Sequence, residues 1–282
     1  MRRLSSAVAG LVLATAVAVP AAALADTGWT QVATGTTGGI SGMAPASSGW
    51  LVVRDNKTAG QNRVALLDDD GRVTQLSWPG TAPSDLESVA AVPGQDSTFA
   101  VLTSTGRGTV ITVSGTTLST VSTFTVPKGQ RNIESFALTS SGSTTIAVWA
   151  SRGSTTAAAR VWAATLDVGS GTFGRISTGT VRVPYPTSDV RQLADLAIVG
   201  DRLVGSSTSD PGVNGPFTSA LYTLGTVGLA SGRAALHLST PEQLDTYSDH
   251  KVEGVACSGS VGLLGSDDEK QGGWTASASF CG

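Results

Sequence analysis

Short apolar runs, separated by turns rich in Gly, Ser and Thr, recur along the whole chain after residue 28. Their lengths and their content of Val, Thr and Ile are typical of β-strands. The pattern therefore predicts an all-β protein. The low content of Leu, Glu and Lys excludes a helical bundle, and 40% hydrophobic residues exclude a disordered chain.

One five-residue motif occurs five times. It begins with Ile, Leu or Val and ends in Ala, and its copies occupy residues 40–44, 86–90, 133–137, 193–197 and 252–256. Their central residues are 46, 47, 60 and 59 positions apart, and the interval from the last copy round to the first, taken from residue 26, is 45. Near-equal intervals of this length are typical of repeat architectures.

Each interval holds four strand-like runs, except that the last lacks a fourth, and residues 28–34 offer one at the other end of the chain. Four strands per repeat is the signature of propeller blades. We therefore predict a five-bladed β-propeller whose N-terminal strand completes the last blade. A six-bladed propeller and a β-sandwich are the alternatives.

Residues 1–25 have the features of a secretory signal: Arg2 and Arg3, an apolar stretch, and a small-x-small site that ends at Ala25. Cleavage there leaves a single domain, 26–282, with a formal charge of −5 and no further apolar stretch of membrane length. We expect a secreted, extracellular monomer without a membrane span. In an oxidising compartment, Cys257 and Cys281 are expected to form a disulfide.

The charge argues against nucleic-acid binding by bulk electrostatics. Two Cys are too few for a four-cysteine zinc site, and a site of two Cys and two His would leave no His for catalysis. No Gly-x-Ser-x-Gly, His-Glu-x-x-His or P-loop motif occurs.

In an up-and-down blade, the start of the first strand lies beside the end of the second. The residues at these two places are mostly polar or charged, and we expect them to surround one mouth of a central channel. Candidate ligand-binding residues there are Ser41, Arg54, Asp55, Lys57, Arg107, Arg152, His250 and Lys270.

Carboxylates gather in the same region. The candidate metal ligands are Asp85, Glu87, Glu134 and Glu253. Two like charges about 5 Å apart repel by about 3 kcal/mol at an effective dielectric of 20, so a cation, raised pKa values or interleaved basic residues must offset them. Oxygen ligands favour Ca2+ or Mg2+. Alternatively, each Glu bonds to neighbouring backbone and only locks the ring.

Other features have simpler interpretations. The run 267–269, Asp-Asp-Glu, is expected to be a solvated turn. His250 is either polar surface or an acid–base group near Glu253. Trp50, Trp149 and Trp274 are expected to pack between blades.

The segments 38–43, Gly-Gly-Ile-Ser-Gly-Met, and 85–90, Asp-Leu-Glu-Ser-Val-Ala, resemble the secreted phytase-like propellers, described as having esterase-like activity of phytase. The sequence differs at Ser88, where the family has Gly, and at 53–56. The resemblance implies a Ca2+-dependent phosphoester hydrolase with roles for Ser41, Asp55, Asp85 and Glu87.

Three functions follow from these features. The absence of a strong catalytic motif favours a propeller that binds a small molecule, glycan, cell-wall component or protein at the channel mouth, with a bound divalent cation. The phytase-like phosphoester hydrolase is the first alternative. The second is a glycoside hydrolase that uses channel carboxylates as acid and base.

Overall fold

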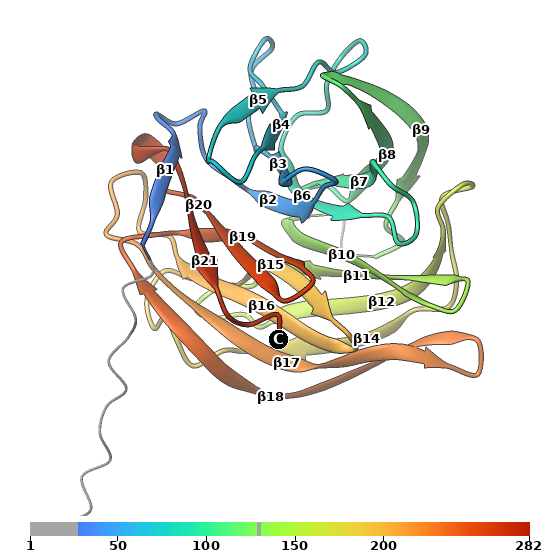
Figure 1. Cartoon of the computed structure of the whole chain (residues 1–282). Helices are drawn as coiled ribbons and strands as arrows, with labels where there is room; N and C mark the ends of the chain where they lie inside the picture. Colours follow the sequence, from blue (N-terminus) through green and yellow to red (C-terminus); the bar gives the residue numbers. More distant parts are fainter. Residues whose placement is uncertain (1–27, 129–130) are drawn as a thin grey trace, which may run out of the picture.

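The computed structural model describes residues 28–128 and 131–282 as five small antiparallel sheets arranged around an axis (Figure 1). The first two blades contain β2 (Gly42–Pro45), β3 (Trp50–Val53), β4 (Val64–Leu67) and β5 (Val73–Gln75), then β6 (Leu86–Ala91), β7 (Thr98–Thr103), β8 (Arg107–Ser114) and β9 (Thr117–Thr125).

The third blade contains β10 (Ile133–Ser141), β11 (Thr144–Ser151) and β12 (Ala159–Asp167), with β13 (Thr172–Phe173) and β14 (Ser177–Val181) both paired to β12. The fourth contains β15 (Val190–Val199), β16 (Arg202–Ser209), β17 (Thr218–Ala230) and β18 (Arg233–Ser248). β17 and β18 form a long hairpin, in which the pairing runs from Thr218 with Ser248 to Ala230 with Arg233 through two bulges.

The fifth blade combines both ends of the described chain. Its strands are β19 (Val252–Ser258), β20 (Val261–Asp267) and β21 (Gly273–Ala278), and β1 (Thr30–Ala33) pairs with β21 at the outer edge. The predicted five-bladed propeller, closed by its N-terminal strand, is confirmed. The signal segment at 1–25 lies outside the described residues.

Four inner strands contain a whole copy of the motif, and β2 contains the last three residues of its copy. Each inner strand contacts the inner strands of the two neighbouring blades. Figure 1 shows β2, β6, β10, β15 and β19 gathered at the centre. This ring leaves little space: a Cβ on Gly42 would lie 2.7 Å from the Cα of Ser88. Small residues in the motif therefore allow the inner strands to approach.

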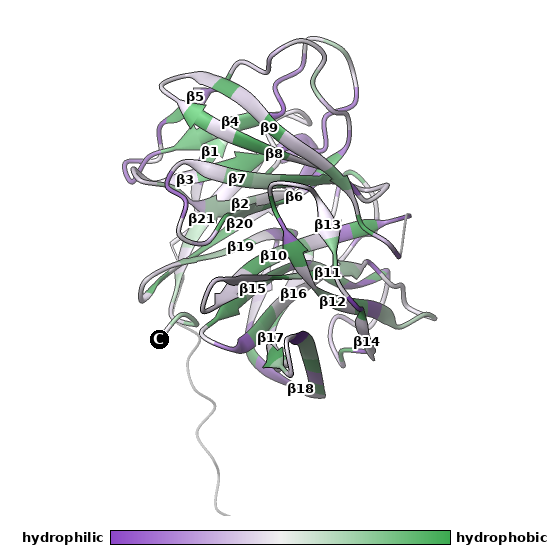
Figure 2. Ribbon diagram, turned by 90° about the vertical axis from the view of Figure 1, so that its right-hand side faces the viewer, coloured by the Kyte–Doolittle hydropathy of each residue, from purple (hydrophilic) through white to green (hydrophobic). Residues whose placement is uncertain are grey.

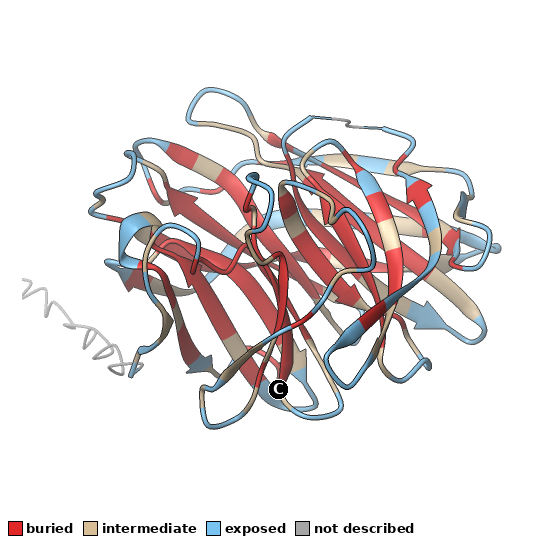
Figure 3. Ribbon diagram, turned by 90° about the horizontal axis from the view of Figure 1, so that it is seen from above, coloured by how far each residue is buried: buried red, intermediate tan, exposed pale blue. Residues whose placement is uncertain are grey.

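Five apolar clusters fill the spaces between neighbouring blades. Both faces of each sheet are covered, which explains why β3 and β7 are buried along their whole length. Hydrophobic residues follow the strands, whereas hydrophilic and exposed residues lie mainly in the connecting loops (Figures 2 and 3). Trp50 and Trp149 are buried as expected, and Trp274 is half-buried.

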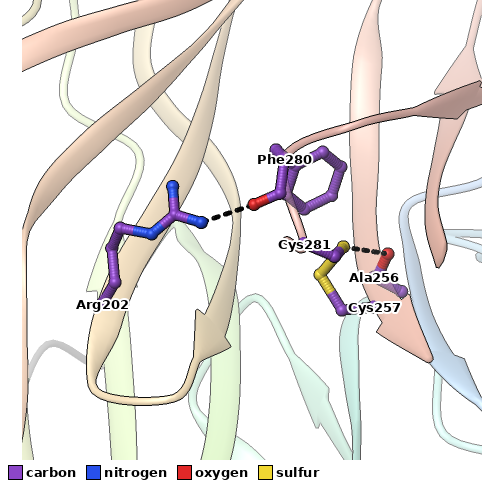
Figure 4. The surroundings of a disulfide bond; sticks show 5 residues. All are labelled: Arg202, Ala256, Cys257, Phe280 and Cys281. Atoms are coloured by element: carbon purple, nitrogen blue, oxygen red, sulfur yellow. Dashed lines mark hydrogen bonds between the residues drawn. A yellow bond between two sulfur atoms is a disulfide. The ribbon is translucent and has the colours of Figure 1, made fainter. Parts of the chain in front are cut away.

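The two cysteines form the expected disulfide, with a Cα–Cα distance of 5.7 Å between Cys257 on β19 and Cys281 after β21 (Figure 4). The bond fits an extracellular location. The described residues contain one short helix, η1 (Glu269–Gln271), and none that is long and apolar enough to cross a bilayer.

Candidate functional site at the channel mouth

Three of the inner strands carry a glutamate at a β-bulge. The strand register shifts between Leu86 and Ser88 in β6, and the same shift recurs in β10 and β19. The extra residue in these three strands is Glu87, Glu134 or Glu253. A bulge re-aims the side chain that it contains, and the three carboxylates lie close enough for the charges of Glu134 and Glu253 to affect Glu87.

Blade 4 replaces the glutamate with an arginine. Its motif has Ala194 at the corresponding position, and the irregular segment of β15 begins at Arg191. The guanidinium Nη1 of Arg191 lies 2.5 Å from Glu253 Oε1 and 3.3 Å from Glu134 Oε2, and its Nη2 lies 2.7 Å from Asp210 Oδ2. Arg191 therefore supplies the positive charge between two of the three glutamates.

A buried lysine supplies a second positive charge. Lys251 is 1% exposed, and its Nζ lies 2.6 Å from Glu269 Oε1 and 3.6 Å from both Glu253 Oε1 and Asp267 Oδ2. Burial raises the pKa of Asp267 to about 7, although the charge of Lys251 opposes this change. Gly39 permits the close packing here, since a Cβ on it would overlap the carboxylate of Asp267.

The expectation that 267–269 is a solvated turn is wrong for its first two residues. Asp267 and Asp268 are 5% and 0% exposed. Their carboxylates have partners in the interior. Asp267 lies near Lys251 Nζ, and Asp268 accepts a hydrogen bond from the backbone N of Lys251 at 2.7 Å and contacts His250 Nδ1 at 2.6 Å. The His250 ring stacks on Trp29 with a centroid distance of 4.0 Å.

The third glutamate belongs to a separate, more accessible cluster. Oxygens of Asp55, Asp85 and Glu87 all lie within 4.8 Å of one another, and all three residues are half-buried. Lys57 Nζ lies 2.9 Å from Asp85 Oδ1 and 3.6 Å from Asp55 Oδ2, but the lysine side chain is 65% exposed. Ser104 donates a hydrogen bond to Asp85. We call Asp55, Asp85 and Glu87 the carboxylate cluster.

Two members of the carboxylate cluster differ in their affinity for protons. Burial raises the pKa of Glu87 well above its usual value, and the charge of Glu134 raises it further. Burial also acts to raise the pKa of Asp85, but hydrogen bonds from Ser104 and Lys57 outweigh it and leave that pKa below its usual value. Such a pair combines a proton donor with an ionised carboxylate.

Hydrogen bonds cross the axis below the mouth. Ser88 Oγ accepts from Phe136 N at 2.9 Å and lies 3.3 Å from Asp195 Oδ1, while Asp195 Oδ2 accepts from Val255 N at 2.9 Å. Burial raises the pKa of Asp195 well above its usual value. These bonds connect blades 2, 3, 4 and 5. The opposite end of the channel is a hollow of about 120 Å³ lined mainly by apolar residues of the five inner strands.

The structure divides the predicted metal ligands into two groups. Asp85 and Glu87 join Asp55 and Lys57 in and around the carboxylate cluster. Glu134 and Glu253 are instead paired with Arg191, and Arg152 Nε lies 3.9 Å from Glu134.

Among the remaining predicted ligand-binding residues, Ser41 contacts a member of the carboxylate cluster, whereas Lys270 and Arg107 lie apart from it. Ser41 is buried and accepts a hydrogen bond from Asp55 N at 3.1 Å, whereas Lys270 is exposed and lies 3.2 Å from Asn214 Oδ1. Arg54 is 6% exposed, and burial lowers its pKa. Arg107 is exposed at the start of β8 in blade 2.

Sequence reasoning missed Arg191. It lies three residues before Ala194, outside the repeated motif. A signal was present: blade 4 is the one repeat that has neither Ser nor Glu at the second motif position, and a basic residue precedes that position closely.

No protein-family model matches the chain, and no curated protein matches its sequence. One similar solved structure comes from work on the GH130 family of mannoside phosphorylases, which contains glycoside hydrolases that target β-1,2-mannosidic linkages in Candida mannan. It has 10% identity and a TM-score of 0.49, with 89% of this chain and 86% of that chain covered. A GH43 endo-arabinanase from Bacillus licheniformis has 10% identity and a TM-score of 0.49, covering 86% and 94%.

A chain of a mitotic checkpoint complex has 11% identity and a TM-score of 0.41, covering 96% of this chain and 99% of that chain. Structural similarities with TM-scores below 0.5 do not indicate an activity for this chain. The five blades are established by the strand pairing. The phytase-like resemblance stays a prediction.

Proposed function

We propose that this protein is a secreted propeller that binds its ligand at the channel mouth through a divalent cation held by Asp55, Asp85 and Glu87. The observation that carries the proposal is the carboxylate cluster itself, whose oxygens lie within 4.8 Å of one another on half-buried residues. Ca2+ binds oxygens at about 2.4 Å, so one ion reaches oxygens up to about 4.8 Å apart.

Charge balance supports a cation at this place. The carboxylate cluster and the ion pairs of four basic side chains together contain eight carboxylates: Asp55, Asp85, Glu87, Glu134, Asp210, Glu253, Asp267 and Glu269 against Lys57, Arg152, Arg191 and Lys251. Arg191 and Lys251 contact other carboxylates, and Glu87 has no ion pair among the described residues. Oxygen ligands favour Ca2+ or Mg2+ over transition metals.

We expect Ca2+ to bind the purified protein and to raise its melting temperature, because a ligand of the native state stabilises it. Glu87→Gln should weaken Ca2+ binding at least tenfold in calorimetric titration, and Lys57→Gln should strengthen it, because the ammonium group competes for the same oxygens. Asp69→Asn, in the turn after β4 on the opposite face, is the matched control and should have no effect.

The pH dependence gives the same proposal a second test. Because the pKa of Glu87 is raised, the free site holds a proton that Ca2+ must displace. Ca2+ affinity should therefore increase as pH rises through the range in which Glu87 loses its proton, and Glu87→Gln should flatten this dependence. Equal Ca2+ affinity in wild type, Glu87→Gln and Asp69→Asn would contradict the proposal.

The opposed proton affinities of Glu87 and Asp85 favour one further candidate, hydrolysis of a glycosidic bond with Glu87 as general acid. A general acid contributes about 10²–10⁴ in rate. If a panel of plant and microbial polysaccharides yields a substrate, Glu87→Gln should lower kcat at least 100-fold while the fold stays intact. A substrate that Glu87→Gln cleaves at the wild-type rate would exclude this role.

The phosphoester hydrolase implied by the family resemblance requires basic side chains that are free to bind phosphate. Among the basic residues that the sequence offers, Lys57 and Arg152 contact carboxylates in the described chain. Arg54 is buried, and the exposed Arg107 lies outside the carboxylate cluster. Phosphoester hydrolysis is therefore the less favoured alternative.

A further inference from the structure

A second recess lies next to the carboxylate cluster. It has a volume of about 690 Å³ and lies between the outer strands of blade 2 and the linker 81–84 that arrives from blade 1. This volume is within the range of about 300–1,000 Å³ that is typical of small-ligand sites. We call it the blade 2 cleft.

Hydroxyl groups dominate the lining of the blade 2 cleft. Seven of its twelve residues are Thr or Ser. In the ladder of β8 and β9, Arg107 is opposite Thr125 and Thr109 is opposite Thr123, so these four side chains lie on one face of the sheet. The cleft therefore presents one guanidinium beside a row of hydroxyls.

Arg107 is the basic residue of this lining. Its side chain is exposed and has no ion pair or side-chain hydrogen bond to residues 28–128 or 131–282. Its backbone is held, because its N donates to Thr103 Oγ1 at 3.2 Å. A free guanidinium on a fixed strand is suited to bidentate binding of a carboxylate.

The opposite wall of the cleft is also held in place. The guanidinium of Arg63 donates to the carbonyl oxygens of Pro83, Gln61 and Thr58 at 3.1, 2.9 and 2.8 Å. These bonds connect the linker 81–84 to the loop that contains Lys57. The cleft is thus formed before any ligand binds, which reduces the entropy cost of binding.

The cleft and the carboxylate cluster share their wall. Ser84 lines the cleft and precedes Asp85, and Thr103 and Thr105 line it on either side of Ser104, whose hydroxyl bonds to Asp85. The lining of the cleft is therefore continuous in sequence with the residues that hold Asp85.

We propose that the blade 2 cleft binds an acidic oligosaccharide, with a uronate carboxylate on Arg107 and the sugar hydroxyls against the Thr and Ser side chains. A single free guanidinium matches one carboxylate, and hydroxyl-rich walls match a sugar ring. Only the contact with the cation rests on the proposed function. The cation would offset repulsion between the ligand and the carboxylate cluster.

The probe is trigalacturonate, with the carboxyl-reduced trisaccharide as its neutral counterpart. Calorimetric titration in Ca2+ should show that the acidic trisaccharide binds at least tenfold more tightly than the neutral one. Arg107→Gln should weaken binding of the acidic trisaccharide at least tenfold, and Arg107→Lys should restore part of that affinity. Arg233→Gln, an exposed arginine at the start of β18, should leave it unchanged.

Separate measurements distinguish the two proposals. Arg107→Gln should leave Ca2+ binding without sugar unchanged, since Arg107 lies outside the carboxylate cluster. In EDTA the trisaccharide should bind more weakly but still depend on Arg107. Equal binding of acidic and neutral sugars, no binding of either, or wild-type affinity in Arg107→Gln would overturn the cleft proposal while Ca2+ binding could stand. An absence of Ca2+ binding with retained dependence on Arg107 would overturn only the cation site.

Discussion

Replacing Arg191 by Met is expected to lower the free energy of unfolding at pH 7 by about 3–5 kcal/mol, the usual cost of removing one partner from a buried ion pair. The variant leaves Glu134 and Glu253, 6% and 5% exposed in their side chains, without the guanidinium between them. A change of this size should lower the melting temperature by about 6–20 °C. Thermal unfolding followed by circular dichroism measures it.

The effect of Arg191→Met should depend on pH. Burial raises the pKa of Glu134, and the charge of Arg191 opposes this. Without Arg191 the pKa of Glu134 rises further, so the native state binds more protons than the unfolded chain over a wider pH range. Stability then falls as pH rises through that range. The deficit of the variant should therefore be larger at pH 8 than at pH 5.

Two controls identify the cause. Arg160→Met removes an exposed arginine from β12 and should change the free energy of unfolding by less than about 0.5 kcal/mol. Adding Glu134→Gln and Glu253→Gln to Arg191→Met removes the uncompensated charges and should recover most of the lost stability. A loss below about 1 kcal/mol in Arg191→Met would mean that the three side chains are not an ion network at the ring centre.

The sequence predicts the architecture well because the repeat is a physical constraint. Each motif copy lies wholly or partly in an inner strand, and the residue before its centre lies at a bulge in three blades. Small central residues, such as Gly42, are needed where neighbouring inner strands approach each other. The five-bladed fold and the acidic residues at the channel mouth can therefore both be predicted from the five-residue motif.

The pairing of charges at the mouth could not be predicted in the same way. Whether Glu134 binds a cation or an arginine depends on Arg191 at the start of β15, which the motif does not include. Similarly, Asp267 and Asp268 are buried because Lys251 and the His250 ring need acceptors between packed blades. The sequence shows three adjacent acidic residues, and only tertiary contacts decide that two of them are internal.

Removing the disulfide by replacing Cys257 and Cys281 with Ser is expected to lower the free energy of unfolding by about 3.5 kcal/mol in the chain-entropy account. The bond spans a sequence separation of 24 and connects the inner strand of the fifth blade to the end of the chain. Urea unfolding of wild type and the double variant measures the difference. Reduction should lower the stability of wild type to that of the variant and leave the variant unchanged.

The loss should be concentrated in the blade that closes the ring. Beyond the disulfide, Arg202 Nη2 donates to Phe280 O at 2.6 Å and holds the chain end to blade 4 (Figure 4). Without the covalent link, amide hydrogen exchange should accelerate first in β21 and β1, because β1 reaches the rest of its sheet only through β21. Uniform acceleration in all five blades would instead show that ring closure and global unfolding are one event. Arg202→Gln should add to the local effect in the double variant.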